Sequence, residues 1–194
     1  MSFEEFLAWA ETIPRETGRF ELRSGRAIAK KGLAGTKNAE QAKYREMKTG
    51  LYRALYAAVA ASGIEAHAVG QGSTVPLASC GRNAEPDALV YLGSKVPRDS
   101  HVVPEPVIVC VVLLPSTAKH DMSARHEFSA KLEGCLAIPS VRHYIIADPD
   151  RPMLIVHSRG SGNNHTNRLV SDPAAVLSLD PPGLRVSVAE VLGG

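Results

Sequence analysis

Histidine and carboxylate side chains occur twice in succession on one stretch of the chain, as His120-Asp121 and His126-Glu127. Both residue types are common zinc ligands. A spacing of six residues, however, places the two histidines on different faces of a helix, unlike the four-residue spacing of H-E-x-x-H zinc sites. KHDMSA is followed at once by RHEFSA, and the two segments match position by position. A tandem duplication in a helix therefore explains the pairs better than a zinc site.

Nucleophilic side chains do not form a recognisable catalytic pattern. Ser116 follows a proline and lacks the G-x-S-x-G turn of serine hydrolases, so we interpret it as a helix N-cap. No positioned histidine is indicated for Cys110 or Cys135, which we expect in the core.

Two acids and a lysine have ordinary roles when each is taken alone. Asp87 follows Pro86 and would bind local backbone amides at the start of a strand. Glu21 lies beside a turn, where most such residues are solvated. Lys131 lies on an amphipathic helix, where most lysines are at the surface.

The elements that must position these residues are those of an α/β domain. Ser2 with Glu5 forms a capping-box pattern that predicts a first helix before Pro14, and Ser24-Gly25 predicts a turn between two brief strands. The stretch RGSGNNHTNR is interpreted as a polar hairpin loop. The remaining patterns predict helices over 38–62 and 117–137, two short strands within 64–77, and strands over 87–92, 106–114, 141–148 and 152–158, of which 106–114 is apolar on both faces and central.

Composition limits the partners and the architecture. A chain of 194 residues with 44% hydrophobic residues supports one core, so we expect a single domain over 1–194. The net charge is +2 and the basic residues are scattered, so charge alone does not indicate nucleic acid. Three cysteines without C-x-x-C spacing and the lack of a long apolar run predict a cytoplasmic protein with no membrane partner.

Four sequence blocks carry a resemblance to a known family. They are RFELRSG, EPDALVYLG, VIVCVVLLPST and AKLEGCLAIPSVRHYIIADPDRP. With them the chain resembles the Uma-type restriction endonucleases (Uma-two family), a bacterial branch of the PD-(D/E)XK nuclease superfamily. The resemblance implies a mixed β-sheet flanked by helices, and a site in which carboxylates hold Mg²⁺, or Mn²⁺, beside a DNA phosphodiester.

The resemblance assigns site residues one at a time. Glu21 and Asp87 match the first two family acids and are implied metal ligands, and Lys131 matches the family lysine. The family strand VIVVEVLSPST places its second glutamate on Val111, which cannot coordinate a metal. A histidine that the family often carries on the long helix falls near Tyr44. Metal binding is therefore expected to be weak.

Two assignments stay open at this point. Counting forward from the strand places the family lysine on Arg125, and counting back from the next strand places it on Lys131. Six extra residues rotate a helix by a net of about 240°, so the two cannot face the same way. We favour Lys131, with the duplication extending the helix toward its N-terminal end. Glu105 and Glu127 are candidates for an acid that replaces the missing glutamate.

The sequence thus predicts a nuclease-fold protein of the metal-dependent DNA phosphodiesterase class with weak or lost activity, and it leaves open whether the chain is an enzyme. One alternative is an active Mg²⁺-dependent endonuclease with a migrated acid. Another is a non-catalytic module that binds nucleic acid or protein. DNA and a second copy of the chain, as a homodimer, are the partners considered.

Overall fold

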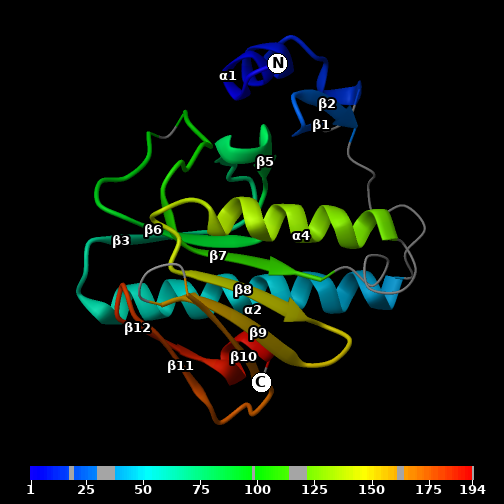
Figure 1. Ribbon diagram of the computed structural model, residues 1–194. Helices are drawn as coiled ribbons and strands as arrows, with labels where there is room; N and C mark the ends of the chain where they lie inside the picture. Colours follow the sequence, from blue (N-terminus) through cyan, green and yellow to red (C-terminus); the bar gives the residue numbers. More distant parts are fainter. Residues whose placement is uncertain (18–19, 30–37, 98, 114–121, 161–163, 194) are drawn as a thin grey trace.

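A mixed six-stranded sheet in the order β10-β9-β8-β7-β6-β3 forms the centre of the protein (Figure 1). The computed structural model describes residues 1–17, 20–29, 38–97, 99–113, 122–160 and 164–193. Neighbouring strands run antiparallel except β7 and β8, which are parallel. The strands are β3 (Ala66–Val69), β6 (Ala88–Leu92), β7 (Pro106–Val112), β8 (His143–Asp148), β9 (Met153–Arg159) and β10 (His165–Val170).

Two layers cover the sheet. The long helix α2 (Asn38–Ser62), the hairpin of β11 (Val176–Leu179) and β12 (Leu184–Ser187), and the short helix α5 (Val188–Leu192) pack on one face. Helix α4 (Met122–Leu136) and the hairpin of β4 (Val75–Leu77) and β5 (Arg82–Ala84) pack on the other. Figure 1 shows α4 and α2 on opposite sides of β7 and β8. Strands covered on both faces are mostly apolar, which explains the composition of β7 and of the middle of β8.

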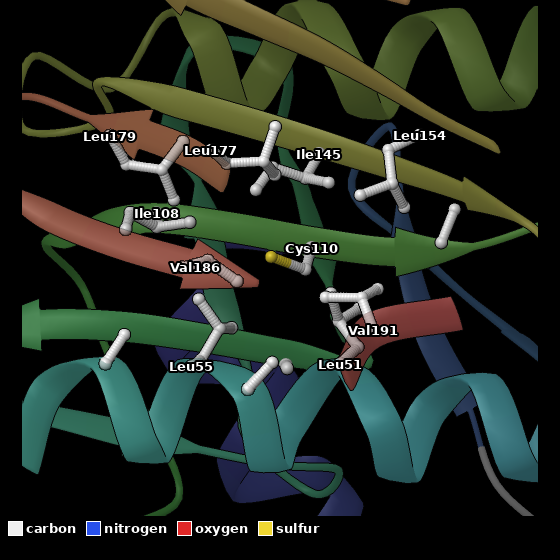
Figure 2. Packing of buried hydrophobic residues seen from close by; sticks show 14 of the residues in the cluster. Leu51, Leu55, Ile108, Cys110, Ile145, Leu154, Leu177, Leu179, Val186 and Val191 are labelled. Atoms are coloured by element: carbon white, nitrogen blue, oxygen red, sulfur yellow. The ribbon is translucent and has the colours of Figure 1, made fainter. Parts of the chain in front are cut away.

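Alternate residues of β7 feed two separate hydrophobic clusters. Ile108 and Cys110 point toward α2 and the β11–β12 hairpin, where they meet Leu51 and Leu55 (Figure 2). Val109 and Val111 belong to the cluster beneath α4. The period of two along a strand therefore places Val111 on the α4 side of the sheet.

The N-terminal elements form as the sequence predicts. Helix α1 (Phe3–Glu11) begins at a complete capping box, in which Ser2 Oγ accepts from the Glu5 amide at 3.1 Å and Glu5 Oε2 accepts from the Ser2 amide at 2.7 Å. Strands β1 (Phe20–Arg23) and β2 (Arg26–Ala29) follow, joined by Ser24 and Gly25 with φ of 47° and 72°. Positive φ at both central residues is the mark of a type I′ hairpin turn, which matches the twist of the strands.

A tight contact holds α2 against α5. A Cβ on Gly50 would lie 2.7 Å from the carbonyl oxygen of Val191 and 2.8 Å from that of Glu190. Real Cβ atoms do not approach backbone that closely, so only glycine permits this helix crossing. The contact fixes the position of the middle of α2 relative to the C-terminal helix.

Arg159 of β9 and His143 of β8 form hydrogen bonds that connect the sheet to neighbouring segments. The guanidinium of Arg159 donates to the carbonyls of Val141, at 3.0 Å, and Ile138, at 3.1 Å, and also to Leu136, so it caps the C-terminal end of α4. His143 is 3% exposed, and its Nδ1 lies 2.8 Å from Ser158 Oγ. Its Nε2 lies 2.9 Å from the Pro181 carbonyl oxygen, which can only accept, so Nε2 carries the proton. Burial lowers the pKa of His143.

The structure corrects one prediction and leaves parts of another untested. The prediction of a loop over RGSGNNHTNR was wrong at Arg159, which ends β9, and from His165 onward, where β10 begins. This edge strand is exposed on both faces along most of its length, so its composition is polar and shows no alternation. The predicted helix start at residue 117 lies outside the described residues. Within the described ranges, no helix combines the length and apolar character needed to span a bilayer.

Candidate active site

Glu21 is a buried carboxylate with a cation on each oxygen. It lies on β1 and is 3% exposed. Oε2 accepts from Lys131 Nζ of α4 at 2.9 Å, and Oε1 is bound by the guanidinium of Arg23. Burial raises the pKa of Glu21, but the charges and hydrogen bonds of Lys131 and Arg23 outweigh it and hold the pKa below its ordinary value. Glu21 is therefore ionised, and we call these three residues the Glu21 group.

The β1 hairpin is fixed where it carries Glu21. The Leu22 amide donates to Asn83 Oδ1 on β5 at 2.5 Å, and both residues are buried. Leu22 itself is 1% exposed. Glu21 and Arg23 flank this anchored residue and point to the same face of the strand, so Arg23 binds Glu21 on the oxygen that Lys131 leaves open.

Both carboxylate oxygens of Asp87 are also bound by protein donors. It stands directly before β6, and its amide donates to the Cys110 carbonyl at 2.9 Å. Oδ2 accepts from the Val112 amide at 2.6 Å, and Oδ1 forms an ion pair with Lys48 Nζ of α2 at 2.6 Å. The side chains of Asp87 and Lys48 are only 12% and 13% exposed.

Tyr44 completes what we call the Asp87 group, with Asp87 and Lys48. Its hydroxyl lies 3.5 Å from Asp87 Oδ1, and the Lys48 ammonium lies 4.3 Å from the centre of its ring. Burial, and then the charge of Asp87, raise the pKa of Tyr44. The phenol therefore keeps its proton and can donate it to Asp87. Its ring face attracts the ammonium.

Val111 lies one residue before the amide that binds Asp87. Its side chain is half-buried and packs in the cluster beneath α4, which includes Phe128 and Leu132. Lys131 is the residue just before Leu132 on that helix. A carboxylate at position 111 would thus project toward α4, whereas valine offers only methyl groups.

A divalent cation does not fit the donor set that these residues present. Mg²⁺ prefers carboxylate oxygens and water in octahedral geometry. All four carboxylate oxygens of Glu21 and Asp87 already accept hydrogen bonds or ion pairs from protein donors. Across the part of the chain that the structure describes, no three His, Cys, Asp or Glu side chains gather closely enough to hold a metal ion. The expected carboxylates are present, but cationic side chains and a backbone amide are bound to their oxygens.

The structure brings some of the predicted site residues together. Lys131 contacts Glu21, which is 110 residues away in the sequence. Only the family resemblance had placed these two residues in one site. The convergence of Asp87 and Lys131 around Val111 stays a prediction, as do the catalytic roles of all three. The side chain of Arg125 lies outside the described residues, so its orientation stays a prediction too.

The alternative acids are placed less favourably or not described. Glu105 is exposed just before β7, whereas Asp87 binds Val112 at the far end of that strand. The six steps of strand from position 105 to position 111 span about 20 Å, so a carboxylate at position 105 is too distant to replace one at position 111. The side chain of Glu127 lies outside the described residues.

Sequence reasoning missed Lys48 and Arg23. A signal existed for each. Lys48 follows Tyr44 by four residues and so shares its helix face, and Arg23 follows Glu21 by two residues and so shares its strand face. These spacings bring each base beside a site residue, but they do not say that its charge is used there.

Comparisons with known proteins agree with this architecture. The Uma2 family model, described as "Putative restriction endonuclease", matches residues 3–189. No curated protein matches the chain. A solved structure of a "putative nuclease belonging to DUF820" from Anabaena variabilis superposes with a TM-score of 0.67 and 16% identity, covering 100% of this chain and 98% of that one. This likeness supports the fold, and the family match extends over nearly the whole sequence, so the chain belongs to the Uma2 family.

Proposed function

We propose that this protein is a nuclease-fold member of the metal-dependent DNA phosphodiesterase class whose hydrolytic activity is weak or lost. One observation carries the proposal: every oxygen of Glu21 and Asp87 is engaged by a protein donor, while the third acidic position is Val111. The family implies divalent metal use and DNA as substrate. Metal binding needs carboxylate oxygens that are free to act as ligands, and Glu21 and Asp87 offer none.

The electrostatics support low activity. Phosphodiester hydrolysis needs fixed positive charge where negative charge develops on the phosphate. In this chain Lys131 and Arg23 direct their charges at Glu21, and Lys48 directs its charge at Asp87. Each cation thus has a carboxylate at ion-pair distance. A phosphate would have to compete with these partners.

Nucleic-acid binding without cleavage is the second candidate. In the Glu21 group, two basic side chains face one carboxylate, so these three residues carry one net positive charge. A site of this sign favours phosphate over a metal cation. Binding that depends on such contacts weakens steeply as the salt concentration rises.

A cleavage assay with matched variants tests the proposal. The purified protein, Asp87→Asn and Val111→Glu are incubated with supercoiled and single-stranded DNA in Mg²⁺, Mn²⁺ or EDTA. We expect the unmodified protein to cleave no faster than Asp87→Asn. Robust metal-dependent cleavage that Asp87→Asn abolishes would overturn the proposal and favour an active endonuclease. Loss of that cleavage in Glu127→Gln would identify the migrated acid.

DNA binding in EDTA separates the two remaining outcomes. Retention of a labelled duplex at low salt, with affinity that falls as salt is added, would favour a binding module. Lys131→Met should then weaken binding. Lack of binding at low salt would contradict that candidate, and the protein would then neither cleave nor bind DNA.

A further inference from the structure

We propose that Lys48 is a built-in cation at Asp87, so that restoring the missing glutamate at Val111 does not by itself restore tight metal binding. The inference rests on the proposed function, because it concerns the same site. It goes further by assigning a second, separate obstacle to metal binding. The obstacle lies on α2, whereas Val111 lies on β7.

The geometry of the ion pair carries this inference. Lys48 Nζ lies 2.6 Å from Asp87 Oδ1, at the distance of a charge-assisted hydrogen bond. The other oxygen, Oδ2, accepts from the Val112 amide at 2.6 Å. A divalent ion at Asp87 would have to share an oxygen with an ammonium group, and two positive centres at such separation repel strongly where water is scarce.

The ammonium is held in place by its surroundings. It lies over the Tyr44 ring at 4.3 Å, and the side chain is only 13% exposed. The next turn of α2 is fixed to the sheet by Leu51, which is 1% exposed, and to α5 by the close approach of Gly50. Lys48 therefore cannot withdraw from Asp87 into solvent without losing both the ion pair and the ring contact.

Lys48 and Lys131 differ in whether the family resemblance predicts them. The family resemblance assigns a lysine to position 131 and none to position 48. Lys131 and Arg23 bind Glu21, so Lys48 provides the charge that balances Asp87 in the described structure. Removing Lys48 should consequently leave Asp87 as a mostly buried carboxylate in need of a cation.

The test is a four-protein set: wild type, Val111→Glu, Lys48→Met and the double variant. Methionine keeps the length of the side chain and removes the charge. Mn²⁺ binding is measured by titration calorimetry and by loss of the electron paramagnetic resonance signal of free Mn²⁺. We expect no binding by the wild type, weak binding by Val111→Glu, and at least about tenfold tighter binding by the double variant, because a competing charge has been removed. Equal affinity of Val111→Glu and the double variant would overturn the inference.

Lys43→Met in the Val111→Glu background is the matched control, because Lys43 is an exposed lysine on the same helix. A similar gain from this variant would show a general charge effect and refute a specific role for Lys48. If the double variant does not fold, Lys48→Gln replaces Lys48→Met. Recovery of the folded circular-dichroism signal on addition of Mn²⁺ would also support the inference, and failure to recover would count against it.

Failure of this inference is distinguishable from failure of the proposed function. Metal-dependent cleavage by the wild-type protein overturns the proposed function whatever the variants bind. Tight Mn²⁺ binding by Val111→Glu alone overturns only the role of Lys48.

Discussion

Lys131→Met tests whether the family lysine has a structural role through Glu21. Two unit charges 2.9 Å apart attract by about 6 kcal/mol at an effective dielectric constant of about 20, before desolvation is subtracted. Removing one partner of a buried pair commonly costs about 3–5 kcal/mol. Arg23 remains on the other oxygen of Glu21 and the Lys131 side chain is 26% exposed, so both reduce the effect. We expect the free energy of unfolding to fall by about 2 kcal/mol.

Urea denaturation followed by circular dichroism measures this change. A double-mutant cycle with Glu21→Gln isolates the part of this loss that comes from the pair of Glu21 and Lys131. Lys43→Met, an exposed substitution, should change stability by less than about 0.5 kcal/mol. A fall in the free energy of unfolding of less than about 0.5 kcal/mol for Lys131→Met would refute the structural role and favour a purely catalytic one.

The pH dependence gives an independent check with a defined sign. The folded-state pKa of Glu21 lies below its ordinary value of about 4.5, so the unfolded chain takes up the proton first as the pH falls. The stabilisation is therefore present above about pH 4.5 and is lost as the pH falls through the folded-state pKa. The difference between wild type and Lys131→Met should accordingly shrink below about pH 4.5 and persist at pH 7. A difference that grows on acidification would contradict the assignment.

Three further outcomes concern the fold. Gly50→Ala should lower the free energy of unfolding by about 1–3 kcal/mol despite the better helix propensity of alanine, because its Cβ meets the Val191 carbonyl; urea denaturation checks this, and an unchanged midpoint would contradict the close approach. His143 is kept neutral, so stability should fall as the pH drops below about 6.5, by up to about 1.4 kcal/mol per pH unit, and His143→Gln should flatten that slope in thermal melts. Arg159→Met should lower the free energy of unfolding by about 2 kcal/mol or more because it leaves the carbonyls at the end of α4 without their donor; hydrogen exchange should show the loss there first, and unaltered protection would argue against the cap.

Much of the secondary structure was predictable because the signals are local. A capping box at Ser2 and Glu5 starts α1, and two residues with positive φ at Ser24 and Gly25 close the first hairpin. The apolar run of β7 indicates a strand covered on both faces. Each of these patterns involves only a few neighbouring residues, so it can be recognised without knowing how the rest of the chain folds. The polar edge strand β10 carries no such pattern and was missed.

The sequence by itself also determined the family and the absence of an acid at Val111, since both are properties of contiguous blocks. Only the tertiary structure decided what the remaining acids bind. Lys131 reaches Glu21 because α4 and the β1–β2 hairpin lie on one side of the sheet, and Lys48 reaches Asp87 because α2 lies on the other. Such pairings depend on how separate layers pack, and charge type and spacing along the chain do not specify that packing. Glu21 and Asp87 are consequently recognisable in the sequence, whereas their pairing with lysine and arginine is a result of the fold.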